Sequence, residues 1–187
     1  MAPYRIRIFG DPVLKQRAAE VTDIDGRLAK LSEDMLATLR GVAGLGLAAP
    51  QIGVQKRLFV YQMGEDEEAA VLINPTISEA RGEWEYEEGC LSLPGLYFPI
   101  VRPKEVHLTG YDLEGNEVSI EADELLARLF QHELDHLEGR LLLELLDKDQ
   151  RKMAMKELRR RDFEGGRPAG LLARVGGRGK QHDGWEL

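Results

Sequence analysis

The chain has 187 residues and a formal net charge of −8, with 43% hydrophobic and 31% charged residues. This composition is typical of one globular domain with a substantial core. The acidic balance argues against a protein that binds nucleic acid through its phosphates, so we expect no DNA partner. No apolar run approaches the roughly 20 residues of a membrane span.

The sequence contains a single cysteine, Cys90, so it forms no internal disulfide. A protein without disulfides suits a reducing compartment. The N-terminal segment also lacks the apolar core of a signal peptide. We therefore expect a cytoplasmic protein that makes no contact with a membrane.

The first half of the chain predicts one helix and two short strands. Asp25 can cap a helix whose apolar residues recur with the 3.6-residue period, and which ends between Gly41 and Gly44. Residues 58–61 and 71–75 are predicted to be strands, joined by an acidic, solvated turn.

Residues 44–49 formally match the Gly-x-Gly-x-x-Ala dinucleotide fingerprint. That fingerprint comes after a strand and opens a helix. Here a helix comes first, and Pro50 and Gly53 interrupt the segment in which the second helix would have to begin, so we reject a nucleotide site. Two interpretations stay open: a tight loop whose backbone approaches another group and where Gln51 presents its amide, or a glycine-rich connection without chemistry.

The middle of the chain holds the cysteine and a predicted hairpin. Cys90 lies between Gly89 and a Pro-Gly pair, which indicates a positioned side chain. Residues 105–111 and 117–120 are predicted to pair as strands. His107 falls inside the first of them, and we expect it to have no role in a site.

The most informative segment is an amphipathic helix that Asp123 can cap and Gly139 can end. His132 and His136 are four residues apart, so they lie on one face with Cβ atoms roughly 5–6 Å apart. Their rings can converge on one divalent metal, and Glu133 can reach a water there. This is the His-Glu-x-x-His pattern of metal hydrolases, although two ordinary helix histidines would look the same.

A catalytic metal site needs a third ligand and one open position. A third histidine six residues beyond His136 is absent, because that position is Leu142. Glu144 and Glu157 remain alternatives, but neither has supporting sequence around it. Cys90 is the only thiol, and a thiolate is a good ligand for zinc or ferrous iron.

Three segments together resemble the signature motifs of the peptide deformylase family. They are Gly-Leu-Gly-Leu-Ala-Ala-Pro-Gln at 44–51, Glu-Gly-Cys-Leu-Ser at 88–92 and Gln-His-Glu-Leu-Asp-His at 131–136. Their order and spacing are similar to the shorter family type, which has no insertion between the first two motifs. The resemblance implies an α+β fold in which antiparallel sheets pack around a central metal-binding helix, with an N-terminal and a C-terminal helix.

The resemblance also implies an activity: a metal-dependent hydrolase that removes the formyl group from the N-terminal formyl-methionine of newly synthesised polypeptides and releases formate. One divalent metal is expected, ferrous iron in the cell and zinc or nickel in preparations. Metal-bound hydroxide would attack the formyl carbon, with Glu133 as general acid/base. The oxyanion would be held by the Gln51 amide and the Leu91 backbone N–H. The implied metal ligands are Cys90, His132 and His136.

The resemblance further assigns residues to the substrate. Gly46 and Gly89 are expected near the path of an extended peptide. The expected methionine pocket, whose apolar members could equally be core residues, consists of Leu45, Tyr86, Leu125, Leu129 and the aliphatic part of Glu88.

The end of the chain divides into a basic helix and a tail. Asp147 can cap the helix, whose position is similar to the one with which family members contact the ribosome, although a solvated helix fits its charge equally well. We expect a catalytic domain over residues 1–163 and a flexible Gly/Arg-rich tail over residues 164–187.

Two other functions compete with the deformylase interpretation. A metallopeptidase that cleaves internal bonds would need a third ligand other than Cys90. A metal-binding or ribosome-associated module without catalysis would need neither Glu133 nor Gln51, so their presence weighs against it.

Overall fold

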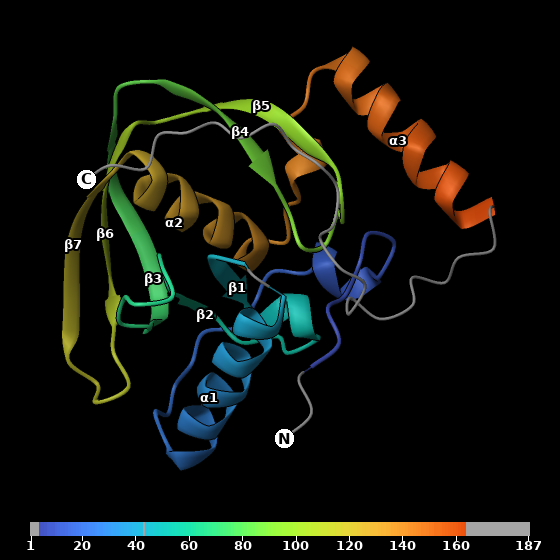
Figure 1. Cartoon of the computed structure of the whole chain (residues 1–187). Coiled ribbons are helices and arrows are strands. Elements are labelled where there is room, and N and C mark those ends of the chain that lie inside the picture. The colour runs from blue at the N-terminus through green and yellow to red at the C-terminus, as the bar shows by residue number, and fades with distance from the viewer. Residues whose placement is uncertain (1–3, 43, 164–187) are drawn as a thin grey trace.

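The structure is a computed structural model that describes residues 4–42 and 44–163, so the tail predicted for 164–187 lies outside the described residues. The described residues form the expected mixture of helices and antiparallel strands (Figure 1). The α-helices are α1 (Gly26–Gly41), α2 (Glu124–Leu137) and α3 (Lys148–Phe163). The strands are β1 (Gly46–Ala48), β2 (Leu58–Tyr61), β3 (Ala70–Arg81), β4 (Trp84–Gly89), β5 (Tyr97–Arg102), β6 (Glu105–Tyr111) and β7 (Glu117–Asp123).

The strands form two antiparallel sheets. The larger sheet has the order β1-β2-β3-β6-β7, and β4 pairs with β5 in the smaller one. Helix α2 lies between the two sheets (Figure 1) and contacts β1, β3, β6 and β7. The helix that carries the histidine pair thus packs against the larger sheet and faces the smaller one. None of the described helices is long and apolar enough to cross a membrane.

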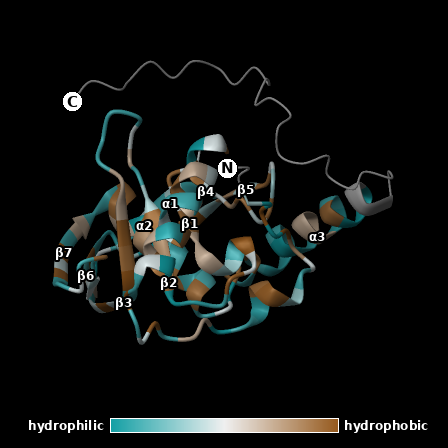
Figure 2. Ribbon diagram, turned by 90° about the horizontal axis from the view of Figure 1, so that it is seen from below, coloured by the Kyte–Doolittle hydropathy of each residue, from teal (hydrophilic) through white to brown (hydrophobic). Residues whose placement is uncertain are grey.

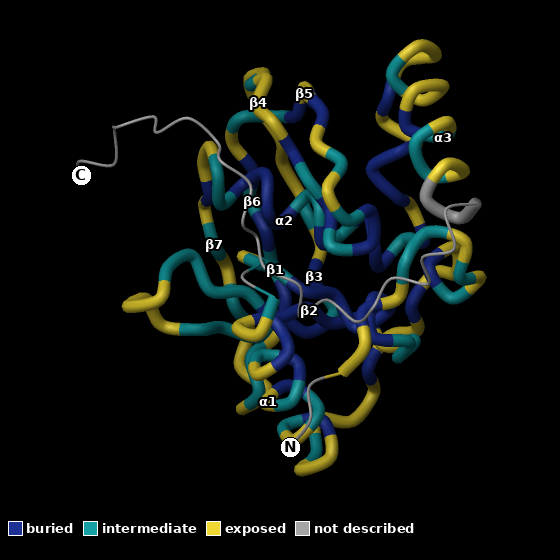
Figure 3. Tube along the Cα trace, turned by 45° about the vertical axis from the view of Figure 1, so that its right-hand side comes forward, coloured by how far each residue is buried: buried dark blue, intermediate teal, exposed yellow. Residues whose placement is uncertain are grey.

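The apolar face of α2 is buried against the larger sheet. Phe130 packs beside Phe59 of β2, with ring centroids 5.9 Å apart. The hydrophobic stretch of β3 is visible in Figure 2, and the buried residues concentrate around β1, β2, β3 and α2 in Figure 3. A separate cluster behind β4 and β5 joins Phe98 and Ile100 to Ala154 of α3. Burial of this apolar surface is the main force that holds α2 in place.

The predicted helix ends are largely confirmed. The Asp25 carboxylate accepts hydrogen bonds from the backbone N–H groups of Arg27 and Leu28, both at 3.0 Å. Asp147 caps α3 in the same way, through two N–H groups of its first turn. Asp123 holds the N-cap position of α2, but its side chain bonds no N–H of that helix. Gly139, at φ +72°, comes after α2 and lets the chain turn away.

Several strands differ from the prediction. The segment for which both open interpretations expected a loop forms β1, an edge strand. A single 3-10 turn over Ala49–Ile52 comes next, so no α-helix begins there, in agreement with the rejected nucleotide site. Strand β3 extends well beyond residue 75, and β7 reaches Asp123. Strand β5 was not predicted, because Pro99 interrupts its pattern; a proline is tolerated there since β5 pairs on one side only.

Candidate metal centre

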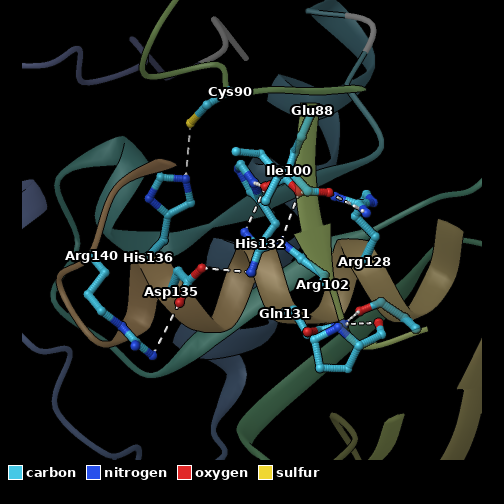
Figure 4. A network of polar contacts seen from close by, with 12 residues as sticks. Glu88, Cys90, Ile100, Arg102, Arg128, Gln131, His132, Asp135, His136 and Arg140 are labelled. Atoms are coloured by element: carbon cyan, nitrogen blue, oxygen red, sulfur yellow. Dashed lines mark hydrogen bonds and ion pairs between the residues drawn. The ribbon is translucent and has the colours of Figure 1, made fainter. Parts of the chain in front are cut away.

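Three donor groups, two of them buried and one partly buried, converge at α2. The ligand atoms of Cys90, His132 and His136 all lie within 4.8 Å of one another. Cys90 Sγ is 3.2 Å from His136 Nε2, and the two imidazole centroids are 5.0 Å apart. The thiol reaches the helix from the end of β4 (Figure 4). The structure therefore brings together the residues that the sequence predicted as ligands.

The carboxylates considered as alternative ligands are engaged elsewhere. Glu144 pairs with Lys15, and Glu157 pairs with Arg160 at 2.7 Å. Neither belongs to the Cys90–His132–His136 cluster. This geometry disfavours a metallopeptidase that uses either carboxylate as its third ligand.

The backbone around Cys90 is shaped by its neighbours. A Cβ atom on Gly89 would collide with the ring of Tyr97, which lies across the strand pair from it. The Leu93 N–H donates to the Cys90 carbonyl at 2.8 Å, which closes a turn directly after β4. Gly89 therefore allows β4 and β5 to approach closely, and the turn directs Cys90 to the helix.

The electrostatic surroundings favour a thiolate at Cys90. Burial alone would raise the pKa of this thiol, but the adjacent rings of His136 and His132 outweigh that effect and hold the pKa well below its usual value. The thiolate is the form of cysteine that binds metal ions.

Glu88 determines which nitrogen of His132 is free. Its Oε1 lies 2.7 Å from His132 Nδ1 (Figure 4). Burial would raise the pKa of Glu88, but hydrogen bonds from Arg102 and His132 lower it, so the group is a carboxylate. A carboxylate accepts a hydrogen bond from Nδ1–H, so the proton stays on Nδ1 and the lone pair of Nε2 is available to a metal. From the sequence, Glu88 was expected only to line the methionine pocket with its aliphatic part.

The carboxylate of Glu88 belongs to a buried ion-pair network that the sequence analysis did not find. Arg102 joins Glu88 to Asp135 of α2, with Nη1 at 2.9 Å from Asp135 Oδ2. Arg128 donates to Glu88 Oε2 at 2.7 Å. Two features of the sequence point to this network. Glu88 precedes Cys90 by two residues, so in an extended chain both side chains point to the same side. Arg128 interrupts an apolar helix one turn before His132, so the two side chains are neighbours on that helix.

Glu133 is buried against β1. It is 3% exposed, and a Cβ atom placed on Gly46 would lie 2.5 Å from its Oε1. Its Oε2 has no hydrogen-bond partner among the described residues. Burial raises the pKa of Glu133. A carboxyl group with a raised pKa and a free oxygen beside the ligand cluster is suited to exchange protons with a water or substrate.

Gln51 has a fixed orientation beside the same cluster. The Ala48 N–H donates to its Oε1 at 2.9 Å. Its Nε2 lies 3.3 Å from Ser92 Oγ and 4.0 Å from Cys90 Sγ. The amide nitrogen of Gln51 therefore faces Cys90 of the cluster. Leu91, whose N–H was the second expected oxyanion donor, is the next residue after Cys90.

The residues expected at the methionine pocket fall into two groups. Leu45 and Tyr86 are 39% and 41% exposed, and Tyr86 stacks on Trp84 with ring centroids 4.7 Å apart. Leu129 is buried in the core cluster around Phe59, and Leu125 is partly buried. The pocket assignment stays a prediction.

Comparison with known proteins identifies the family. The family model described as "Polypeptide deformylase" matches residues 3–152, most of the chain. The chain belongs to this family. It is accordingly a metallohydrolase, and the sequence-based resemblance is confirmed.

Similar deformylases are found among both curated proteins and solved structures. Those of Acidothermus cellulolyticus and Clostridium botulinum are 45% and 47% identical, over 88% and 77% of this chain and 91% and 97% of their own. The crystal structure from Legionella pneumophila is 39% identical with a TM-score of 0.84, covering 89% of this chain and 99% of its own. The structure from Ehrlichia chaffeensis in complex with actinonin has a TM-score of 0.82 and 36% identity, covering 87% and 99%.

Proposed function

We propose that this chain removes the formyl group from the N-terminal formyl-methionine of newly synthesised polypeptides, and that Cys90, His132 and His136 hold its metal ion. The observation that carries this proposal is the cluster of one buried thiol, one buried imidazole and one partly buried imidazole, beside the oxygen of Glu133 that has no partner among the described residues. One sulfur and two nitrogen donors suit a four-coordinate ion with one position left open.

A divalent cation held there would supply a Lewis acid and lower the pKa of water enough to provide a nucleophile near neutral pH. The donor set suits ferrous iron as well as zinc. The resemblance to the family implies iron in the cell and zinc or nickel in preparations. Cys90 makes the iron-loaded enzyme oxygen-sensitive, because a thiolate is readily oxidised.

Glu133 would move the protons of the reaction. Its Oε2 has no hydrogen-bond donor among the residues that the structure describes, so it can accept a proton from the attacking water and pass it to the leaving amine. Gly46 supports this role, since its missing side chain leaves the space that the Glu133 carboxylate occupies.

Gln51 and the Leu91 backbone N–H would stabilise the oxyanion that develops on the formyl oxygen. The hydrogen bond from Ala48 fixes the Gln51 amide in advance, with its nitrogen turned to Cys90 of the ligand cluster. Donors that are oriented before the reaction need no reorganisation when charge develops.

The substrate would lie extended between the two sheets. Strand β1 is at the edge of the larger sheet, so one side of its backbone can pair with a peptide. Gly46 lies in β1 and Gly89 at the end of β4, on either side of this path. The methionine side chain would enter the pocket formed by Leu45, Tyr86, Leu125, Leu129 and the stem of Glu88.

The activity is tested by formate release from a formyl-Met tripeptide, with protein loaded with ferrous iron without oxygen. We expect rapid release from the formyl peptide and none from the acetyl-Met control. Absence of formate from protein that carries one metal per chain would refute the proposed function.

We also propose that α3 contacts the ribosome in the cytoplasm. Its residues 148–160 contain six basic and two acidic side chains, a balance of +4 on a chain of net charge −8. Ala154 packs inward, whereas Arg151, Lys152 and Lys156 are exposed. Co-sedimentation with ribosomes tests this: reversing those three charges to glutamate should abolish binding, and binding that persists would contradict it.

A further inference from the structure

Arg128 is a buried cation in a network beside the metal ligands. It lies on α2 one turn before His132 and is 3% exposed. Its guanidinium donates to Glu88 Oε2 at 2.7 Å, to the Trp84 carbonyl at 2.7 Å and to the Ile100 carbonyl at 3.0 Å. One side chain of α2 thus bonds to both strands of the smaller sheet (Figure 4).

The Arg128 guanidinium also makes cation–π contacts with two aromatic rings. Its central carbon lies 5.1 Å from the centroid of the Trp84 ring and 5.8 Å from that of Tyr86, and the two rings stack on each other. A planar guanidinium can stack on aromatic rings and donate within its own plane at once, which an ammonium cannot do. The site therefore specifies arginine and not merely a positive charge.

The two oxygens of the Glu88 carboxylate accept hydrogen bonds from Arg128, Arg102 and His132. Its Oε2 accepts from Arg128 Nη1 and Arg102 Nε, whereas its Oε1 accepts from Arg102 Nη2 and His132 Nδ1. The position of the oxygen that faces His132 thus depends on both arginines. Two buried guanidinium groups also balance the two buried carboxylates, Glu88 and Asp135.

We infer that Arg128 is a positioning residue for the metal centre: it holds Glu88 against His132 and fixes β4, which carries Cys90 at its end, over α2. This inference rests on the proposed function only in taking Cys90, His132 and His136 as the ligands. Carboxylates that orient a ligand histidine contribute about 10- to 100-fold in metal affinity, and Arg128 acts through such a carboxylate.

The test is the metal affinity of Arg128→Lys, measured by competition with a chromophoric chelator for Zn²⁺ and compared with the wild type. Lysine keeps the charge but cannot bond Glu88 and two carbonyls together. We expect at least about a 10-fold loss of affinity. Arg128→Gln, which keeps a planar donor without the charge, is measured alongside and is expected to lose affinity too.

Arg57→Lys is the matched control. Arg57 is equally buried and ties α2's end to β3, through Glu138 at 2.6 Å and the Pro75 carbonyl at 2.9 Å, but it does not touch Glu88. It should lose stability to a similar degree while its zinc affinity stays within about 3-fold of wild type.

A spectroscopic measurement distinguishes a specific effect on the orientation of His132 from a general loss of stability. In zinc-loaded protein with ¹⁵N-labelled histidine, the His132 Nδ1 proton should be protected in wild type and Arg57→Lys but exchange faster in Arg128→Lys. Wild-type zinc affinity in folded Arg128→Lys or Arg128→Gln, or an unchanged Nδ1 proton, would overturn the inference. Failure of the wild type to bind zinc through Cys90 would instead refute the proposed function.

Discussion

Gly46→Ala probes the contact between β1 and the proposed acid/base. The added Cβ would lie 2.5 Å from Glu133 Oε1 and 2.9 Å from its Cδ. Both distances are shorter than the 3.4 Å at which ordinary van der Waals contact begins. The Glu133 carboxylate must therefore retreat by about 0.9 Å. A misplacement of about 1 Å at a reacting group lowers rates about 100-fold. We expect kcat to fall by about that factor while metal content stays unchanged.

The assay is formate release at saturating formyl-Met tripeptide, together with metal analysis and thermal unfolding. Gly26→Ala is the matched control, because a Cβ on Gly26 at the start of α1 meets no atom within 4 Å. It should leave kcat unchanged. A kcat for Gly46→Ala within about 3-fold of wild type would refute the reasoning, since the carboxylate would then move without consequence for catalysis.

Individual side chains give three further predictions. Glu133→Ala should keep the metal and lose about 100- to 10,000-fold in kcat, measured as formate release with metal analysis; retained turnover would contradict its acid/base role. Gln51→Ala should lower kcat about 100- to 1000-fold with metal content unchanged, and an unaltered kcat would rule it out as an oxyanion donor. Burial would raise the pKa of Glu144, but its hydrogen bond from Lys15 outweighs this and lowers it below the ordinary value of 4.5. The Lys15–Glu144 ion pair therefore stabilises the fold at pH values above about 4.5. This stabilisation is lost as the pH falls through the lowered pKa of Glu144. Chemical denaturation should show Glu144→Gln less stable by under about 1 kcal/mol at pH 7 and equal to wild type in acid; a difference that persists in acid would exclude this ion pair as the cause.

The sequence predicted the ligand cluster because each part leaves a local pattern. The apolar period of α2 fixes which residues share a face, so His132 and His136 had to lie together. Cys90 was a candidate because it is the only thiol and comes after a glycine, and the resemblance of residues 88–92 to a deformylase motif favoured it over Glu144 and Glu157. The helix bounds could be predicted from Asp25 and Gly139, whose roles depend on neighbouring residues alone.

The supporting network could not be predicted in the same way. Strand β4 places Glu88 on the same face as Trp84 and Tyr86, and that pattern alone does not show that the carboxylate is buried. Its burial is possible only because Arg102 and Arg128, distant in sequence, neutralise it. Such pairing depends on how β4 packs over α2. Likewise β1 is a strand only because β2 supplies its partner.

The central claim is that Cys90 ligates the metal together with the two histidines of α2. Titration of metal-free protein with Co²⁺, followed by thiolate-to-cobalt absorption in the near ultraviolet, tests it most directly. We predict saturation at one ion per chain, with a charge-transfer band that is absent from Cys90→Ala and binding weakened at least about 10-fold in that variant. Equal Co²⁺ affinity in folded Cys90→Ala, or wild-type binding without the band, would contradict the claim.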